Sequence, residues 1–402
     1  MKLHYKAVTE KGKTVGGIVE ANDTKDAAQF LRSKELFPIT ITRKEKNKLT
    51  DILPFFSNKV RRKDIVLFTR QMSLMLVSGL TLVKSLDILK TEATSEPMKE
   101  LVDGIITDIQ EGSSFSTAIA KYPEVFYPVY VSIVRASEGS GLLDKSLTRL
   151  SYSLEKQAKL KSTIKAAFTY PVIILVMMIL VVFLMMTFVI PRLTELYKEL
   201  DVELPLATKI VIYMSNFTTV FWPVILGMGF LFAFLLRRFN KTIEGKTLID
   251  NLVLKLPIFG NLIKKTTLIE IARTLGLLIG SGTLVVKSLA ETADVAGNIH
   301  YKNAILDVST RVEKGITVGD ALSFYTLFPP ILVQLVKVGE QTGKLEETLL
   351  KASDYFEAEV DEIVRTLTTA MEPFIMAILG LGVGFLIFSI ITPIYKLTSS
   401  IQ

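Results

Sequence analysis

The fold of this chain is set by an uncharged run, VIILVMMILVVFLMMTFVI, which occupies residues 172–190 between two prolines. A helix needs about 20 apolar residues to cross the hydrocarbon core of a bilayer. Two further uncharged runs cover residues 210–236 and 374–395. One such run could be a buried helix of a large soluble core, but three of them favour membrane-spanning helices. The sequence therefore predicts an integral membrane protein with three transmembrane helices.

Composition limits the chemistry that the chain can carry. Of its 402 residues 49% are hydrophobic and 22% charged, and a mean hydropathy of +0.41 is typical of a membrane protein with large water-facing parts. The absence of cysteine excludes disulfides, thiolate nucleophiles and iron–sulfur clusters. His4 and His300 are the only histidines and cannot form a multi-histidine metal centre. We therefore expect no cofactor and no metal.

The distribution of basic residues predicts the orientation. A net charge of +7 could indicate a nucleic-acid partner, but basic residues also gather on the cytoplasmic side of membrane spans. They precede the first span and follow the second, at Lys156, Lys159, Lys161, Lys165, Arg237, Arg238, Lys241 and Lys246. We therefore expect a cytoplasmic N-terminus, an outer C-terminus and no nucleic acid. No span begins within the first 30 residues, so no cleavable signal peptide is expected.

The chain contains the same unit twice. A shift of 203 residues superposes residues 70–86 on residues 273–289, with eight identities in seventeen positions that include Arg70 and Arg273. After a one-residue gap the shift becomes 202, and it pairs Glu138/Glu340, Gly141/Gly343, Glu155/Glu357, Pro171/Pro373 and Pro191/Pro393. Each unit is a cytoplasmic domain followed by one span. The second span is an extra helix that returns the chain to the cytoplasm.

Local signals divide each unit into helices. Apolar residues recur with a helical period, and glycines and prolines mark helix ends, so six helices with short connections are expected in each bundle. Ser113 and Ser114 can cap a short fourth helix. The first ~50 residues differ, because alternating apolar and polar residues there predict strands beside one short helix.

The predicted fold is mainly α, with three transmembrane helices, two homologous six-helix cytoplasmic bundles and a small N-terminal α+β module. The predicted domains are the module at 1–50, a linker at 51–63, the first bundle at 64–167, a span at 168–191, an outer loop at 192–209, a span at 210–236, the second bundle at 237–370, a span at 371–396 and an outer tail at 397–402.

Two possible reaction sites are disfavoured. The stretch AVTEKGKT at residues 7–14 is a relaxed version of the phosphate-loop pattern, but the residues after it are typical of a strand, whereas that loop requires a helix. The uncharged spans lack the acidic and basic residues that mark intramembrane chemistry. Glu372, just before the third span, is most simply an interfacial residue.

Surface contacts remain as candidates. The corners that contain Glu138 and Glu340 are interpreted either as helix-capping turns, with the glutamate near a helix N-terminus, or as contact ridges for a partner. Acidic residues around Glu357 are most simply a solvated helix face. The candidate partner contacts are Glu138, Gly141, Glu340, Gly343, Arg70 and Arg273. The candidate residues for helix packing in the membrane are Pro171, Pro191, Pro373, Gly380, Gly384 and Pro393.

Several motifs carry a family resemblance: Phe68-Thr69-Arg70-Gln71, Arg273-Thr274-Leu275, Tyr170-Pro171, Glu372-Pro373 and the run from Val338 to Leu345, VGEQTGKL. Together they resemble the platform proteins of type IV pilus assembly and type II secretion systems in the bacterial inner membrane. The resemblance implies a non-enzymatic protein that couples a cytoplasmic hexameric motor ATPase to pilin or pseudopilin subunits. It also implies other inner-membrane assembly proteins as partners and a homodimer or higher homo-oligomer. A small transporter or intramembrane enzyme is the alternative.

Overall fold

The computed structural model describes residues 2–9, 14–21, 24–34, 36–43, 59–199 and 206–400. Most of the predicted linker, residues 200–205 of the predicted outer loop and the end of the predicted tail lie outside these residues. The chain divides into two compact units, Met1–Arg61 and Arg62–Gln402, and each is described by itself.

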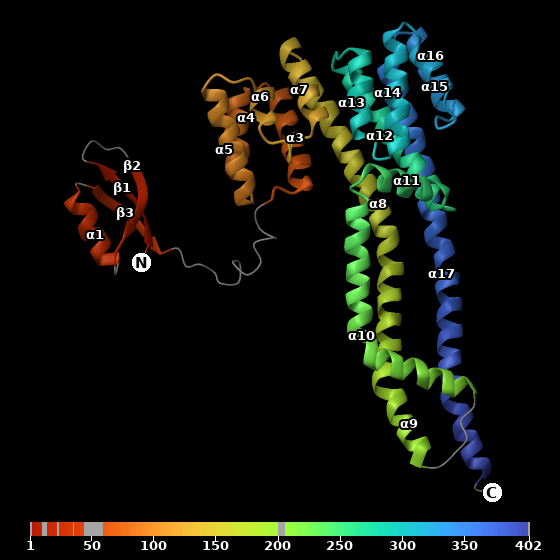
Figure 1. Cartoon of the computed structure of the whole chain (residues 1–402). Coiled ribbons are helices and arrows are strands. Elements are labelled where there is room, and N and C mark those ends of the chain that lie inside the picture. The colour runs from red at the N-terminus through yellow and green to blue at the C-terminus, as the bar shows by residue number, and fades with distance from the viewer. Residues whose placement is uncertain are drawn as a thin grey trace. The chain divides into compact units, whose positions relative to one another are not determined.

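The N-terminal unit is a small α+β module (Figure 1). Its elements are β1 (Lys2–Thr9), β2 (Thr14–Glu20), α1 (Thr24–Ser33) and β3 (Leu36–Arg43). The antiparallel sheet has the order β2-β1-β3, and α1 buries Ala27 and Leu31, which lie one turn apart. A strand therefore begins at Thr14, as predicted, and the helix that a phosphate loop requires does not follow it.

The first six-helix bundle matches the predicted helix pattern closely. Its helices are α3 (Arg62–Val77), α4 (Leu82–Glu92), α5 (Glu96–Gln110), α6 (Phe115–Ala120), α7 (Pro128–Ser140) and α8 (Leu143–Leu184). Phe126 and Tyr130 pack with ring centroids 5.0 Å apart, and Phe68 lies against Phe126 in the same buried cluster. A hydroxyl–hydroxyl hydrogen bond of 3.1 Å joins Tyr130 to Thr69 of α3.

The second bundle repeats this arrangement and adds one helix. Its helices are α11 (Ile243–Lys255), α12 (Phe259–Gly280), α13 (Val285–Val295), α14 (Ile299–Glu313), α15 (Val318–Ser323), α16 (Pro330–Gln341) and α17 (Leu345–Ser400). Left-handed glycines recur in register in the two bundles, as the pairs Gly79/Gly282, Gly112/Gly315 and Gly141/Gly343. The internal duplication is thus visible in the backbone. The additional helix is α11, which the sequence pattern did not separate.

Within the residues that the structure describes, three helices are long and apolar enough to cross a membrane, in agreement with the three predicted spans. The first and third are continuations of bundle helices, since α8 runs for 42 residues and α17 for 56 residues without a break (Figure 1). The predicted boundaries at 167/168 and 370/371 therefore lie inside single helices. Pro171 removes only one hydrogen bond from α8, and every other backbone group in a lipid-facing helix must stay paired within it.

The first span ends in a wide helical turn. The π-helix η1 (Met185–Val189) joins α8 to α9 (Ile190–Glu199), and the second span is α10 (Leu206–Phe239). Pro191 has no N–H to donate to the carbonyl four residues earlier, which favours a local change of helical register. Ser215 of α10 donates its hydroxyl to the Met186 carbonyl in this turn, so the two spans are joined there.

Candidate functional site

The duplicated glutamates lie at the C-terminal ends of α7 and α16, and both reach the N-terminus of the short fourth helix of their own bundle. The Glu138 carboxylate accepts hydrogen bonds from the N–H groups of Phe115 (2.6 Å) and Ser116 (3.0 Å). Glu340 makes the equivalent pair with two successive N–H groups of α15, at 2.9 and 3.1 Å. The glutamates therefore cap a helix more than twenty residues earlier in the chain.

Each carboxylate supplies two of the hydrogen bonds that the first turn of a six-residue helix lacks. The first N–H groups of a helix have no partner inside it, and they carry partial positive charge that a carboxylate stabilises. Ser114 completes the set in α6, because its Oγ accepts from the Thr117 N–H at 3.2 Å. Thr317 does the same in α15 for the Asp320 N–H at 3.1 Å. The fourth helix is thus held in place by its neighbour.

The turn that follows each glutamate faces outward. Gly141 and Gly343 have φ values of 70° and 69°, in the left-handed region that favours glycine, and both are exposed. The N–H of Leu142 donates to the Ser137 carbonyl at 2.9 Å, and Lys344 makes the matching bond at 2.8 Å. The structure therefore directs the glutamate into the bundle and leaves the glycine turn on the surface.

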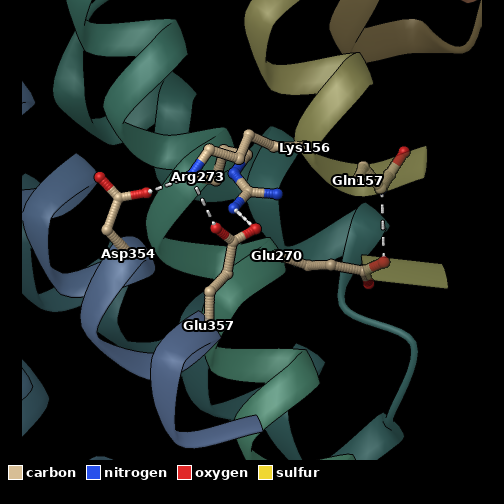
Figure 2. A network of polar contacts seen from close by, with 6 residues as sticks. All are labelled: Lys156, Gln157, Glu270, Arg273, Asp354 and Glu357. Carbon is tan, nitrogen blue, oxygen red and sulfur yellow. Dashed lines mark hydrogen bonds and ion pairs between the residues drawn. The ribbon is translucent and has the colours of Figure 1, made fainter. Parts of the chain in front are cut away.

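A polar network joins the two bundles (Figure 2). Lys156 of α8 lies 3.2 Å from a carboxylate oxygen of Glu357 and 3.3 Å from one of Asp354, both on α17. The other oxygen of Glu357 pairs with the Arg273 guanidinium of α12 at 2.5 Å. Gln157, next to Lys156, donates to Glu270 of α12 at 3.4 Å. Helix α8 of the first bundle therefore lies across α12 and α17 of the second.

The centre of the network, the pair of Arg273 and Glu357, is withdrawn from water. The side chains of Arg273 and Glu357 are 8% and 12% exposed. Burial opposes the charged form of Lys156, but a hydrogen bond to Glu357 and attraction to it, with smaller contributions from Tyr152 and Asp354, outweigh that effect and raise the pKa of Lys156. Lys156 therefore stays charged at neutral pH beside the two carboxylates of α17.

Two further contacts extend this joint. Arg149 of α8 pairs with Glu346 of α17 at 2.6 Å and donates to the Gly280 carbonyl at 3.0 Å. Ser132 of α7 donates to Glu291 of α13 at 2.9 Å. A cavity of about 600 Å³ lies between the corners of the two bundles. In the described part of the chain no three His, Asp or Glu side chains gather as a metal site.

The structure separates the predicted surface residues. Arg70 is exposed and lies 3.5 Å from Glu155, whereas its repeat equivalent Arg273 is buried. The partner contact expected at Arg273 does not fit this burial, because the guanidinium is enclosed by α8 and α17. Glu357 also differs from expectation, since it belongs to this buried pair and not to a solvated face. The duplication in the sequence could have identified this pair, because its arginine and its glutamate both recur in the first unit, as Arg70 and Glu155.

The predicted membrane-packing residues have different surroundings. Pro171 is buried, Pro191 half-buried and Pro373 exposed. At Gly380 and Gly384 no described atom lies within 4 Å of the position that a Cβ would occupy, beyond the helix itself. Close packing at these glycines therefore does not occur within the described chain, and packing against another chain stays a prediction. Pro393 lies near the end of α17.

The arrangement matches a known protein family. The family described as "Type II secretion system (T2SS), protein F" matches residues 68–191 and 271–393, and its N-terminal domain matches residues 4–42. A type IV pilus assembly protein PilC of Thermus thermophilus is 34% identical over 400 residues, 99% of this chain and 98% of the relative. PilC of Pseudomonas aeruginosa is 36% identical over 84% of this chain and 91% of its own.

A secretion protein is also similar. The type II secretion system protein F of Vibrio cholerae is 26% identical over 99% of this chain and 98% of its own length. The two family matches coincide with the two bundles and the spans that follow them. The chain therefore belongs to the family of type II secretion system protein F and its PilC-like relatives.

Proposed function

We propose that this protein is a non-enzymatic inner-membrane platform that couples a cytoplasmic hexameric motor ATPase to pilin-like subunits. The observation that carries this proposal is the continuity of α8 and α17, each of which is both a bundle helix and a membrane span. At about 1.5 Å per residue these helices are roughly 60 and 80 Å long. A displacement of a bundle is thus transmitted to the membrane without an intervening loop.

The joint between the bundles supports the same function. The buried pair of Arg273 and Glu357, together with Lys156, ties the sixth helix of one bundle to the other. A force applied to either bundle is therefore shared by both of the helices that continue into the membrane. The hydrolysis step belongs to the motor, and the pilin or pseudopilin subunits lie beside the spans.

Pilus assembly is favoured over secretion. The pilus assembly relatives named above are 34% and 36% identical, whereas the secretion relative is 26% identical. In the proposed orientation the N-terminal module and both bundles face the cytoplasm, and the C-terminus lies outside. Other inner-membrane assembly proteins and further copies of this chain complete the assembly.

We assign partner contact to the exposed parts of the corners. Gly141 and Gly343 lie on the surface, and Arg70 is exposed, so these positions are accessible to a motor or a neighbouring subunit. Glu138 and Glu340 contribute by fixing the turn from inside. A charge reversal at either glutamate would weaken partner binding through the shape of the corner.

The proposal is tested by breaking the continuity of α8. Insertion of Gly-Gly-Ser after Ala166 separates the bundle from its span, and a matched insertion after Asn240 falls in the existing turn between α10 and α11. We expect the first insertion to abolish piliation while membrane insertion and co-purification with the motor persist, and the second to be tolerated. Normal piliation with the first insertion would refute the proposed transmission, as would ATPase turnover by the purified chain alone.

A further inference from the structure

The two bundles of one chain pack through different faces. The first bundle uses its fifth and sixth helices, α7 and α8, and we call this side of a bundle the inserting face. The second bundle uses its first, second and sixth helices, α12, α13 and α17, and we call this side the receiving face. A contact between unlike faces of similar units leaves one unused face at each end. Within the described unit from Arg62 onward, the receiving face of the first bundle and the inserting face of the second are therefore free.

The receiving face differs in exposure between the bundles. In the second bundle Arg273 and Leu277 of α12 are buried, with exposed fractions of 7% and 6%. Their repeat equivalents on α3 are Arg70 and Leu74, and Leu74 is 59% exposed. Leu67 and Val77 are exposed on the same side of α3, at helical spacing from Leu74. Leu74 is thus open to solvent where its duplicate is covered, and the equivalents of Leu67 and Val77 are the half-buried Glu270 and Gly280.

The inserting face shows the converse. In the first bundle Val129 is buried and Ser132, one turn later, contacts α13 of the second bundle. The equivalent residues of α16 are Ile331 and Gln334, which are exposed. Val338, one turn further along α16, is 51% exposed. Ile331 and Val338 are therefore exposed apolar residues on the inserting face of the second bundle.

Two of the pairs that meet within the chain have matched equivalents on the free faces. Lys156 meets Asp354 within the chain, and their repeat equivalents are Ala358 and Tyr152. A charged pair is replaced by an uncharged pair, with the change on both sides. Arg149, which binds Glu346 in the chain, is matched by Lys351 on the free inserting face, and Glu346 is matched by Asp144 on the free receiving face. One oppositely charged pair is thus kept on the free faces and one is replaced on both sides, whereas Glu155, the equivalent of Glu357, keeps its charge beside Arg70.

We propose that the receiving face of the first bundle binds the inserting face of the second bundle in another copy of this chain, so that the contact within the chain recurs between chains. This rests on the homo-oligomer included in the proposed function and specifies its interface. Helices α8 and α17 leave their bundles toward the same end (Figure 1). The operation that superposes the first bundle on the second, a rotation with a translation, therefore keeps both spans in one membrane. Repetition of this operation adds copies side by side, as a ring where the rotation closes and as an open row where it does not.

The first test uses one charge on each face of the full-length protein in nanodiscs. Leu74→Glu blocks the free receiving face and Val338→Glu blocks the free inserting face, and both side chains are exposed, so the bundles remain folded. By mass photometry the unchanged protein is expected to be oligomeric and each variant alone monomeric at the same concentration. An equimolar mixture of the two variants should form dimers and nothing larger, because one intact pair of faces remains.

The second test uses the absence of native cysteine. Ser132→Cys with Glu291→Cys reports the contact within the chain, and their repeat equivalents, Gln334→Cys and Ile88→Cys, report the proposed contact between chains. Mixed chains that carry one cysteine each, at Gln334 and at Ile88, should cross-link to a dimer. Chains that carry only the Ile88→Cys change should not.

The outcomes separate the possible failures. A monomeric unchanged protein overturns both this interface and the homo-oligomer of the proposed function. An oligomer that persists in both charge variants overturns this interface alone. An oligomer lost only in the Leu74→Glu variant shows a like-with-like contact and overturns the head-to-tail arrangement. Piliation and motor co-purification of the α8 insertion variants are read independently of all three.

Discussion

The duplicated arginines provide a matched test of what holds the bundles together. Arg273→Met removes the cation from a pair whose side chains are 8% and 12% exposed, whereas Arg70→Met removes the equivalent cation from a pair that is 60% and 40% exposed. Loss of one partner of a buried pair costs about 3–5 kcal/mol. Lys156 still lies 3.2 Å from Glu357, which places the cost near the lower limit, at about 3 kcal/mol. An exposed pair contributes about 0–1 kcal/mol.

The two variants are compared by circular dichroism in the same detergent and at one scan rate. For large domains each kcal/mol shifts Tm by about 2–4 °C, so Arg273→Met should lower Tm by roughly 6–12 °C and Arg70→Met by at most about 4 °C. Adding Glu357→Leu to Arg273→Met removes the buried carboxylate that has lost its arginine, while Lys156 keeps Asp354, and should recover at least half of the loss. Equal shifts for the two arginine variants would refute the claim that the joint is buried and stabilising.

Three further changes test the corners and one surface network. Glu340→Gln leaves one acceptor oxygen for two N–H groups, so it should cost about 1–2 kcal/mol and speed amide exchange at Val318. Gly343→Ala places a side chain on a left-handed residue in open space and should lower stability by about 1 kcal/mol, measured by Tm. Hydrogen bonds from Tyr325 and from a neighbouring arginine lower the pKa of Asp307. Its stabilising effect is therefore present above about pH 4 and lost as the pH falls further, so Asp307→Asn should flatten the acid branch of the Tm profile; an unchanged branch contradicts this assignment.

Local signals predicted most helix ends in the bundles. Ser114, Pro128 and Gly141 act within one turn of themselves, so their effects follow from chemistry that is visible in the sequence. The continuity of α8 through Pro171 was not predicted, because the cost of a proline in a helix is outweighed by the need to pair backbone groups in lipid. Helix α11 was missed because it directly follows a span and has no counterpart in the first unit.

Tertiary contacts defined the rest of the candidate site. A glutamate near a helix N-terminus was expected at Glu138, but the helix that it caps lies more than twenty residues away. The burial of Arg273 depends on α8 of the other bundle. The residues around Arg273 and Arg70 show no local pattern that predicts which of the two is buried. Duplication identified the pair, and only the packing of the bundles identified which copy is enclosed.

The helix α10 has a consequence for the origin of the molecule. One bundle with one span crosses the bilayer an odd number of times. A plain tandem fusion of two such halves would therefore place the second bundle on the opposite side of the bilayer from the first. A single added crossing restores the parity and lets both halves share one compartment. An ancestral half, with one bundle and one anchor, could have associated with copies of itself through the same pair of faces. On this view the fusion made permanent a contact that had first formed between separate polypeptides.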